Sequence, residues 1–378
     1  MRPRSLPPRF DGRLHDPRTA TVIGRWLGAA FVLCFLTGLI SHFMQHPPSW
    51  PSGFPSRPVR GYRVTQGLHV ASGIAAVPLL LAKLWTVYPK LFAWPPVRSP
   101  RHALERLSVG LLVGAAVLEV ATGLLNTAQW YPWPFSFVPV HYALAWVVTG
   151  SLVLHIAVKA PQIRDHWSRR STGTQALPPE DAWDRRSLLT AVGVAAGAVT
   201  VTTVGQSFTP LKSLDLLAPR HPDKGLQGLP VNRTAVAAGV GTVATDGYRL
   251  TVDGPHPFVL TLSDLRGLPQ YEAELPIACV EGWSKSAHWG GVRIADLLER
   301  AGAPARGRVR VISLQTRGGY RVSELDVAHA RDPLTLLALR LHGEELAPDH
   351  GFPARLIAPN RPGVLQTKWV GRLEVLGA

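Results

Sequence analysis

Five long stretches of the chain carry few charged residues and are apolar enough to cross a lipid bilayer as helices. A transmembrane helix needs about 20 predominantly apolar residues, and each stretch has about that length. The predicted spans run over residues 22–44, 66–88, 107–127, 139–160 and 188–206. The fifth span has the weakest hydrophobic pattern, because it is rich in Ala, Gly, Val and Thr. The first half of the chain is therefore predicted to be an all-α transmembrane helical bundle of four helices, with a fifth linking span.

The second half contains short segments in which apolar and polar residues alternate. A period of two predicts half-buried strands, here at 248–252, 258–262, 275–278, 309–314, 355–358 and 367–375. Short helices are predicted at 294–301, closed by Gly302, and at 264–266, with Ser263 as the N-cap. Short strands with a few short helices predict an α+β domain.

These patterns divide the chain into six regions. They are a basic arm (1–20), a four-helix membrane domain (21–165), a loop (166–186), a fifth transmembrane helix (187–206), a linker (207–230) and a soluble domain (231–378).

The basic residues predict how the spans are oriented. The formal net charge is +15, and fifteen Lys and Arg residues lie in segments 1–21, 89–106 and 159–186, on one side of the spans. The opposite side has only Arg57, Arg60 and Arg63 in the same flanking loops. Basic loops remain in the cytoplasm, which predicts a multi-pass cell-membrane protein with a cytoplasmic N-terminus and an extracytoplasmic C-terminal domain. The basic excess is thus explained by topology, and no nucleic-acid partner is expected.

Arg185 and Arg186 directly precede the fifth span and allow two interpretations. They could form an internal twin-arginine export signal, which would carry a folded, cofactor-loaded domain across the membrane. Alternatively, two arginines simply flank the inner end of a span.

Histidines inside the predicted spans are candidate functional residues, because ionisable groups are costly in lipid. His141 and His155 are 14 residues apart in the fourth span. At 100° per residue they fall about 40° short of four full turns, so they share a helix face about 21 Å apart along the axis. His69 enters the second span at a depth comparable to His141. This spacing suits two stacked haems.

Residues 20–165 resemble the four-helix cytochrome b membrane subunits of formate dehydrogenases and hydrogenases. The residues that carry this resemblance are Trp26, Thr37-Gly38, His69, His141 and His155. The resemblance implies an outer haem b bound by His69 and His141, an inner haem b on His155, and a membrane quinone as partner. Arg25 stands where that family often has a histidine, so the inner haem lacks its second ligand unless His102 replaces it. The alternative is that the histidines only hydrogen-bond within the bundle; Glu119 could serve proton transfer to quinone or be a core carboxyl.

The chain has two cysteines, Cys34 in the first span and Cys279 in the soluble domain. Their placement argues against a disulfide, and Cys279 lies at the end of a predicted strand, a usual place for a functional residue. A lone cysteine is most often a buried small residue, and no CxxC or histidine pair lies near it to indicate zinc or iron–sulfur. A single thiolate binds a metal only if another group, such as a dithiolene, supplies further ligands.

The soluble domain resembles the molybdopterin domain of the sulfite oxidase superfamily. The matching motifs are Cys279-Val280-Glu281-Gly282-Trp283-Ser284, Trp289-Gly290-Gly291-Val292, the 349–359 stretch from Asp349 to Pro359, and Lys368-Trp369-Val370. The resemblance implies that the Cys279 thiolate binds molybdenum beside the two dithiolene sulfurs of one molybdopterin. It implies cofactor-pocket roles for Asn232, Arg233, Glu281, His350, Arg355 and Lys368. Arg317 and Tyr320, in a Gly-rich loop, are candidates to face the metal, with a solvated charge as the alternative for Arg317.

One departure bears on the substrate. Animal and plant sulfite oxidases continue after the Lys-Trp strand into a dimerisation domain with an active-site tyrosine, whereas this sequence ends ten residues after Lys368. The Cys279–Ser284 stretch is closer to the bacterial periplasmic methionine-sulfoxide reductase catalytic subunit. A sulfoxide-like substrate is therefore favoured over sulfite.

The sequence thus predicts a membrane-bound molybdenum oxidoreductase of the oxygen-atom-transfer type. It would act on a small extracytoplasmic substrate and exchange electrons with haem b and quinone. Two alternatives remain open: a haem-free bundle that only anchors the domain, with soluble electron carriers, or a binding module that has lost its cofactor.

Overall fold

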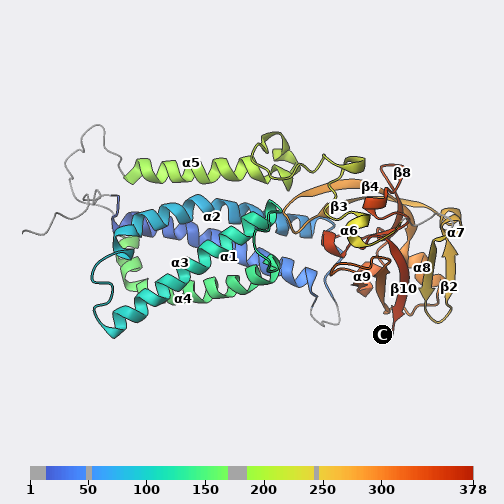
Figure 1. Cartoon of the computed structure of the whole chain (residues 1–378), viewed down its shortest axis with the longest axis horizontal. Coiled ribbons are helices and arrows are strands. Elements are labelled where there is room, and N and C mark those ends of the chain that lie inside the picture. Colours follow the sequence, from blue (N-terminus) through green and yellow to red (C-terminus); the bar gives the residue numbers. More distant parts are fainter. Residues whose placement is uncertain (1–13, 48–52, 169–184, 242–246, 378) are drawn as a thin grey trace, which may run out of the picture. The chain divides into compact units, whose positions relative to one another are not determined.

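The computed structural model of the protein describes residues 14–47, 53–168, 185–241 and 247–377 (Figure 1). The chain forms two compact units. The first comprises Met1–Leu36, Leu68–Val204 and Ser213–Pro219, and the second comprises Thr37–Gly67, Gly205–Lys212 and Arg220–Ala378. The predictions for residues 1–13 and 169–184 lie outside the described residues. The second unit thus includes the segment Thr37–Gly67 as well as most of the C-terminal half of the chain.

Within the described residues, five helices are long and apolar enough to cross a membrane. They are α1 (Pro17–Gln45), α2 (Gly61–Leu91), α3 (Pro100–Thr127), α4 (Phe137–Ser168) and α5 (Arg185–Thr203). All five predicted spans are confirmed as helices; each begins a few residues earlier than predicted, and α5 ends at Thr203, where a 3-10 turn follows to Gln206. At α3 the extension has a clear cause, because Ser99 caps the N-terminus by accepting from the His102 amide and Pro100 occupies the first turn.

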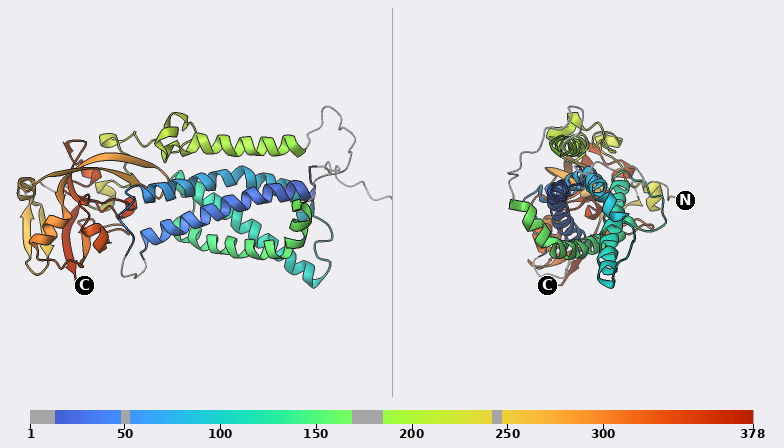
Figure 2. Two further views of the ribbon diagram at one scale, coloured as in Figure 1. Left: turned by 180° about the vertical axis from the view of Figure 1, so that it is seen from behind. Right: turned by 90° about the vertical axis from the view of Figure 1, so that its left-hand side faces the viewer.

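The helical unit has a core of small and branched side chains. Its buried residues come from α1 to α4 and are Leu27, Ala76, Leu79, Leu80, Ala115, Ala116 and Val148. Figure 2 shows these four helices end-on. Large apolar side chains such as Leu81, Leu107 and Val153 are exposed on the outside. A soluble unit rarely exposes so much apolar surface, so this exterior suits lipid.

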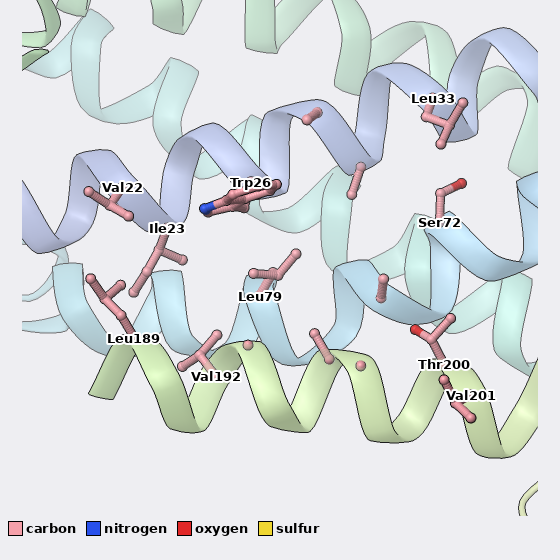
Figure 3. Close-up of a pocket in the computed structure, with 16 residues that line it drawn as sticks. Val22, Ile23, Trp26, Leu33, Ser72, Leu79, Leu189, Val192, Thr200 and Val201 are labelled. Atoms are coloured by element: carbon pink, nitrogen blue, oxygen red, sulfur yellow. The ribbon is translucent and has the colours of Figure 1, made fainter. Parts of the chain in front are cut away.

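A groove of about 600 Å³ lies between α1, α2 and α5 (Figure 3). Trp26 from α1, Leu79 from α2 and Val192 from α5 line it, and no charged side chain does so. Ser72 and Thr200 contribute the hydroxyl groups in its wall. The groove therefore offers no binding site for an ionic ligand.

The second unit contains two five-stranded sheets in its described part. One has the order β2-β1-β10-β5-β6, in which β1 and β10 are parallel and the other pairs antiparallel. The other has the order β3-β4-β7-β8, with β9 paired to β7, and is antiparallel. The strands are β1 (Arg249–Asp253), β2 (Phe258–Thr261), β3 (Tyr271–Ala278), β4 (Ser284–Arg293), β5 (Arg308–Ser313), β6 (Val322–Leu325), β7 (Leu336–Leu341), β8 (Glu344–Glu345), β9 (Arg355–Ile357) and β10 (Val370–Leu376).

Short helices complete this unit and confirm the predicted α+β class. They are α6 (Ala235–Ala238), α7 (Leu262–Gly267), α8 (Ile294–Arg300) and α9 (Val327–Ala330). Two buried clusters form its main cores: one contains Leu250, Leu265 and Ile294, and the other contains Cys279 and Trp289. Burying one such leucine contributes about 2 kcal/mol. Cys279, the predicted metal ligand, therefore lies in a packed core.

Two details of the predicted elements are wrong. Thr261, rather than Ser263, caps α7, because its side chain accepts from the Asp264 amide and Asp264 bonds back to the Thr261 amide in a capping box. The last strand begins at Val370 rather than Thr367, because Trp369 has a left-handed backbone with φ 53°.

Candidate functional site

Two histidines of the helical unit lie close together. The ring centroids of His69 in α2 and His141 in α4 are 6.0 Å apart, with an interplanar angle of 86°. The structure therefore brings together the pair predicted to bind the outer haem.

The hydrogen bonds of these rings differ in how well they suit an iron ligand. A ligating imidazole gives one nitrogen to the metal and hydrogen-bonds through the other. His69 has this arrangement, because Nδ1 lies 2.9 Å from the Cys34 carbonyl oxygen and Nε2 has no hydrogen-bond partner among the described residues. His141 uses both nitrogens, Nδ1 with Thr122 Oγ1 at 3.0 Å and Nε2 with Glu119 Oε1 at 3.1 Å. His69 fits an axial ligand, whereas His141 would first have to leave Glu119.

His155 has cationic neighbours rather than a second imidazole. Within the described part of the chain, the charged groups that act on it are Lys83, Lys159 and Glu105. His102, considered as a replacement ligand, accepts a hydrogen bond from the Arg98 amide at 3.1 Å through Nδ1. The predicted inner haem therefore gains no second ligand from this geometry.

Cys279 lies in the hairpin between β3 and β4. Its carbonyl oxygen accepts from the Gly282 amide at 3.0 Å and its amide donates to the Trp283 carbonyl at 2.9 Å. Gly282 has φ 90°, a conformation that glycine adopts without steric cost. The tight turn therefore fixes the cysteine at the strand end, as the sequence predicted.

The Cys279 sulfur is almost fully enclosed, with 4% of the residue exposed. The Asn232 side-chain amide donates to Sγ at 2.8 Å. Burial, and after it the negative charge of Glu281, raise the pKa of the thiol to about 12. Arg220 and the Asn232 amide oppose this shift without reversing it, so a metal ion that binds the sulfur would displace its proton.

Arg220 connects two of the predicted residues. Its guanidinium lies 3.6 Å from the Glu281 carboxylate and donates to the Asn232 side-chain oxygen at 3.5 Å. Glu281 is thereby turned towards Arg220. The sequence analysis did not identify Arg220, since it falls in the stretch predicted to be a linker.

Buried Arg355 and half-buried Lys368 have no carboxylate partner among the described residues. Arg355 is 4% exposed; its Nη1 donates to the His350 carbonyl at 3.3 Å, while its Nε has no hydrogen-bond partner in the described residues. Lys368 Nζ donates to the carbonyl oxygens of Asp349 at 2.6 Å and Arg233 at 3.0 Å. Burial lowers the pKa of Arg355 to about 10 and that of Lys368 to about 7.

Arg355 and Lys368 approach each other at Gly351, since a Cβ added to Gly351 would lie 3.2 Å from Arg355 Cβ and 3.1 Å from Lys368 Cβ. No Asp or Glu side chain within the described ranges lies within 4.0 Å of Arg355 or Lys368. Buried charges are normally paired, because desolvation disfavours the charged form. A phosphate would restore that pairing with charge-assisted hydrogen bonds.

The C-terminal part of the chain matches a known family. Residues 237–378 match the family model of the oxidoreductase molybdopterin binding domain. This match agrees with the α+β class seen in the structure and with the resemblance stated from the sequence motifs.

Three relatives show how far the likeness extends. The chain is 34% identical over 120 residues to the uncharacterized oxidoreductase YuiH of Bacillus subtilis, covering 32% of this chain and 59% of YuiH. It is 30% identical to human mitochondrial sulfite oxidase over 159 residues, 34% of this chain and 29% of that protein. It is 31% identical over 162 residues to the putative protein-methionine-sulfoxide reductase subunit YedZ1 of Azospira oryzae, 42% of this chain and 61% of YedZ1. The chain spans less than two thirds of each relative.

The glycine-rich loop of the molybdopterin domain lies against the predicted cofactor residue Arg233. A Cβ added to Gly318, which has φ 96°, would lie 2.6 Å from the Arg233 guanidinium carbon. Arg317 and Tyr320 of this loop are exposed. Partial burial of the phenol, and after it Cys279, raise the pKa of Tyr320.

His350 has a structural position in the molybdopterin domain. It is 1% exposed, and its Nε2 lies 2.6 Å from the Leu226 carbonyl oxygen. Burial lowers its pKa to about 4, so the ring is neutral at pH 7 and donates from Nε2. The neutral His350 ring therefore adds no charge beside Arg355, and the His350 carbonyl accepts a hydrogen bond from the Arg355 guanidinium.

Proposed function

We propose that the protein is a membrane-bound, molybdopterin-dependent oxidoreductase. The observation that carries this proposal is the buried Cys279 thiol, which lies in the region that matches the molybdopterin binding domain and accepts from Asn232, a residue that precedes this region. The unpaired cations Arg355 and Lys368 support it, since the cofactor ends in a phosphate.

The site residues then have the following proposed roles. Cys279 would bind molybdenum as a thiolate, and Asn232 would stabilise the sulfur charge by donating to it. Arg355 and Lys368 would bind the phosphate. Arg317 and Tyr320, whose side chains are exposed, would orient a polar substrate. When bound, the cofactor supplies two-electron oxygen-atom transfer.

The substrate is proposed to be a small sulfoxide that is reduced, with oxidation of a sulfite-like anion as the second possibility. The names of two relatives support these chemistries, one a putative methionine-sulfoxide reductase subunit and one a sulfite oxidase. The predicted positive-inside topology would place this reaction outside the cytoplasm.

Electrons are proposed to pass through haem b between His69 and His141 and to exchange with membrane quinone. The free Nε2 of His69 supports this route. A specific observation favours the alternative, a haem-free bundle with soluble electron carriers: both nitrogens of His141 are already hydrogen-bonded.

An optical spectrum with molybdenum and iron analysis of the detergent-purified protein tests the proposal. We expect one molybdenum per chain and a Soret band with about one iron. Molybdenum without a Soret band, despite haem supply, would support the anchor alternative. Absence of molybdenum would reject the enzyme and favour a cofactor-free binding module.

A further inference from the structure

The end of α1, Phe54 and the start of α2 pack beside the Cys279 hairpin within the second unit. Tyr62, at the start of α2, is 1% exposed and forms a buried cluster with Met44 and Ala278. Phe54 packs against the same cluster. Ala278 directly precedes Cys279, so a residue from outside the matched domain lies beside the candidate metal ligand.

The Tyr62 hydroxyl has a hydrogen to give. Gln45 Nε2 donates to this hydroxyl at 3.4 Å, and no acceptor for its own hydrogen occurs among the described residues. Burial, and after it the electrostatic effects of Cys279 and Tyr320, raise the pKa of the phenol. Buried phenols usually find a hydrogen-bond partner, so the unused hydrogen indicates a missing acceptor beside a residue that packs against Ala278, the neighbour of Cys279.

Asn360 fixes the position of Tyr62 through three hydrogen bonds. Its Oδ1 accepts from the Tyr62 amide at 2.7 Å, its Nδ2 donates to the Pro55 carbonyl at 2.7 Å, and its amide donates to the Val59 carbonyl at 3.0 Å. A Cβ on Gly61 would lie 2.7 Å from Asn360 Oδ1, so glycine permits this approach. The backbone of Tyr62, from which the phenol projects, is therefore held by a residue 298 positions away.

The turn itself is tied to the same elements. Gln66 Nε2 donates to the Val280 carbonyl at 3.2 Å, and Gln66 Oε1 accepts from Ser41 at 3.0 Å. Ser207 donates to the Gly282 carbonyl. Carbonyl groups on both sides of Glu281 are thus satisfied by residues that precede the matched domain, which fixes the hairpin relative to Tyr62.

We propose that Tyr62 completes the molybdenum site, where its phenolic hydroxyl donates a hydrogen bond to the oxygen atom of the substrate. Asn360 is a positioning residue that acts through Tyr62. The phenol polarises the substrate oxygen, and no bond of its own is made or broken. This inference rests on the proposed function, and it would make the oxidoreductase site incomplete without the start of α2.

The test compares Tyr62→Phe with Tyr248→Phe in the detergent-purified, molybdenum-loaded full chain. Tyr248 is an equally buried tyrosine whose hydroxyl donates to the Val370 carbonyl at 2.6 Å, so its variant controls for the loss of a buried phenol. The readouts are molybdenum content, the Mo(V) electron paramagnetic resonance spectrum, and kcat and KM with dimethyl sulfoxide and with sulfite as probes.

For Tyr62→Phe we expect full molybdenum content, an altered Mo(V) spectrum and about a tenfold loss of kcat/KM, the size of one hydrogen bond. Asn360→Ala should alter the spectrum in the same direction. Tyr248→Phe should leave both readouts unchanged.

A Tyr62→Phe spectrum and kcat/KM equal to wild type would overturn the inference. Loss of molybdenum in Tyr62→Phe alone would also overturn it, because the phenol would then be structural. Wild-type protein without molybdenum, or inert towards both probes, would instead reject the proposed function.

Discussion

The Asn232 side-chain amide lies 2.8 Å from Cys279 Sγ and donates a hydrogen bond to it. The two residues are 47 positions apart, and Arg220 orients the amide by donating to its oxygen. A donor aimed at a sulfur favours the thiolate, which is the form that binds a metal.

Replacing Asn232 with Leu removes this donor at similar side-chain size. Hydrogen bonds to charged groups contribute about 1.5–3 kcal/mol, so we expect kcat/KM to fall about 10- to 100-fold. Turnover per molybdenum with a sulfoxide probe measures the effect. An Asn232→Leu enzyme with wild-type turnover would show that the amide has no part in the chemistry.

The cation pocket predicts how the cofactor is retained. Arg355→Gln and Lys368→Met should each lower molybdenum content several-fold, because each removes one charge facing the phosphate. Mass-spectrometric metal analysis of purified protein measures this. Arg372→Gln is the control, since Arg372 is exposed and pairs with Asp253 and Glu374 on the surface. Equal losses in all three variants would mean that charge in general, not the pocket, matters.

His350 predicts a pH dependence of stability. Its pKa is lowered from 6.5 to about 4, so the native state favours the neutral ring. The unfolded chain then binds more protons between pH 6.5 and 4, and stability falls as the pH falls through that range. The loss is on the order of 2 kcal/mol by pH 5.

His350→Gln retains a donor for the Leu226 carbonyl and cannot be protonated. We expect thermal unfolding of the molybdenum-free full chain, followed by tryptophan fluorescence, to depend less on pH in this variant. Parallel wild-type and variant profiles between pH 6.5 and 4 would contradict the assignment.

The histidine pair predicts the origin of a Soret band. His69→Leu should remove the band and the bound iron, because His69 presents a free Nε2. Glu119→Gln should retain the band, since His141 must leave Glu119 to bind iron. His46→Ala is the control. A Soret band that survives His69→Leu unchanged would place the haem elsewhere.

Local patterns explain which features the sequence could predict. Long apolar runs predicted all five helices, and alternation predicted β1, β2, β5 and β9 closely. Cys279 could be placed at a strand end because the run before it is apolar and glycine follows. At Thr261, the capping box depends on a side chain returning to the backbone, which the alternation pattern does not reveal.

The remaining site residues depend on contacts between distant segments. Gln66 meets Val280 across 214 residues and Tyr62 meets Asn360 across 298. Neither Tyr62 nor Asn360 stands in a motif, and Tyr62 directly precedes an apolar span. Arg220 lies in a stretch without a helix or strand period, so no pattern singled it out. Such residues acquire a role only when folding brings their partners together.

The central claim is that Cys279 is a sulfur ligand of molybdenum. Molybdenum K-edge X-ray absorption of the wild type and of Cys279→Ser, with metal content measured for both, tests it directly. We predict three sulfur neighbours in the wild type, one fewer in the variant, and loss of turnover in the variant. An unchanged sulfur shell with full molybdenum content and retained activity would contradict the claim.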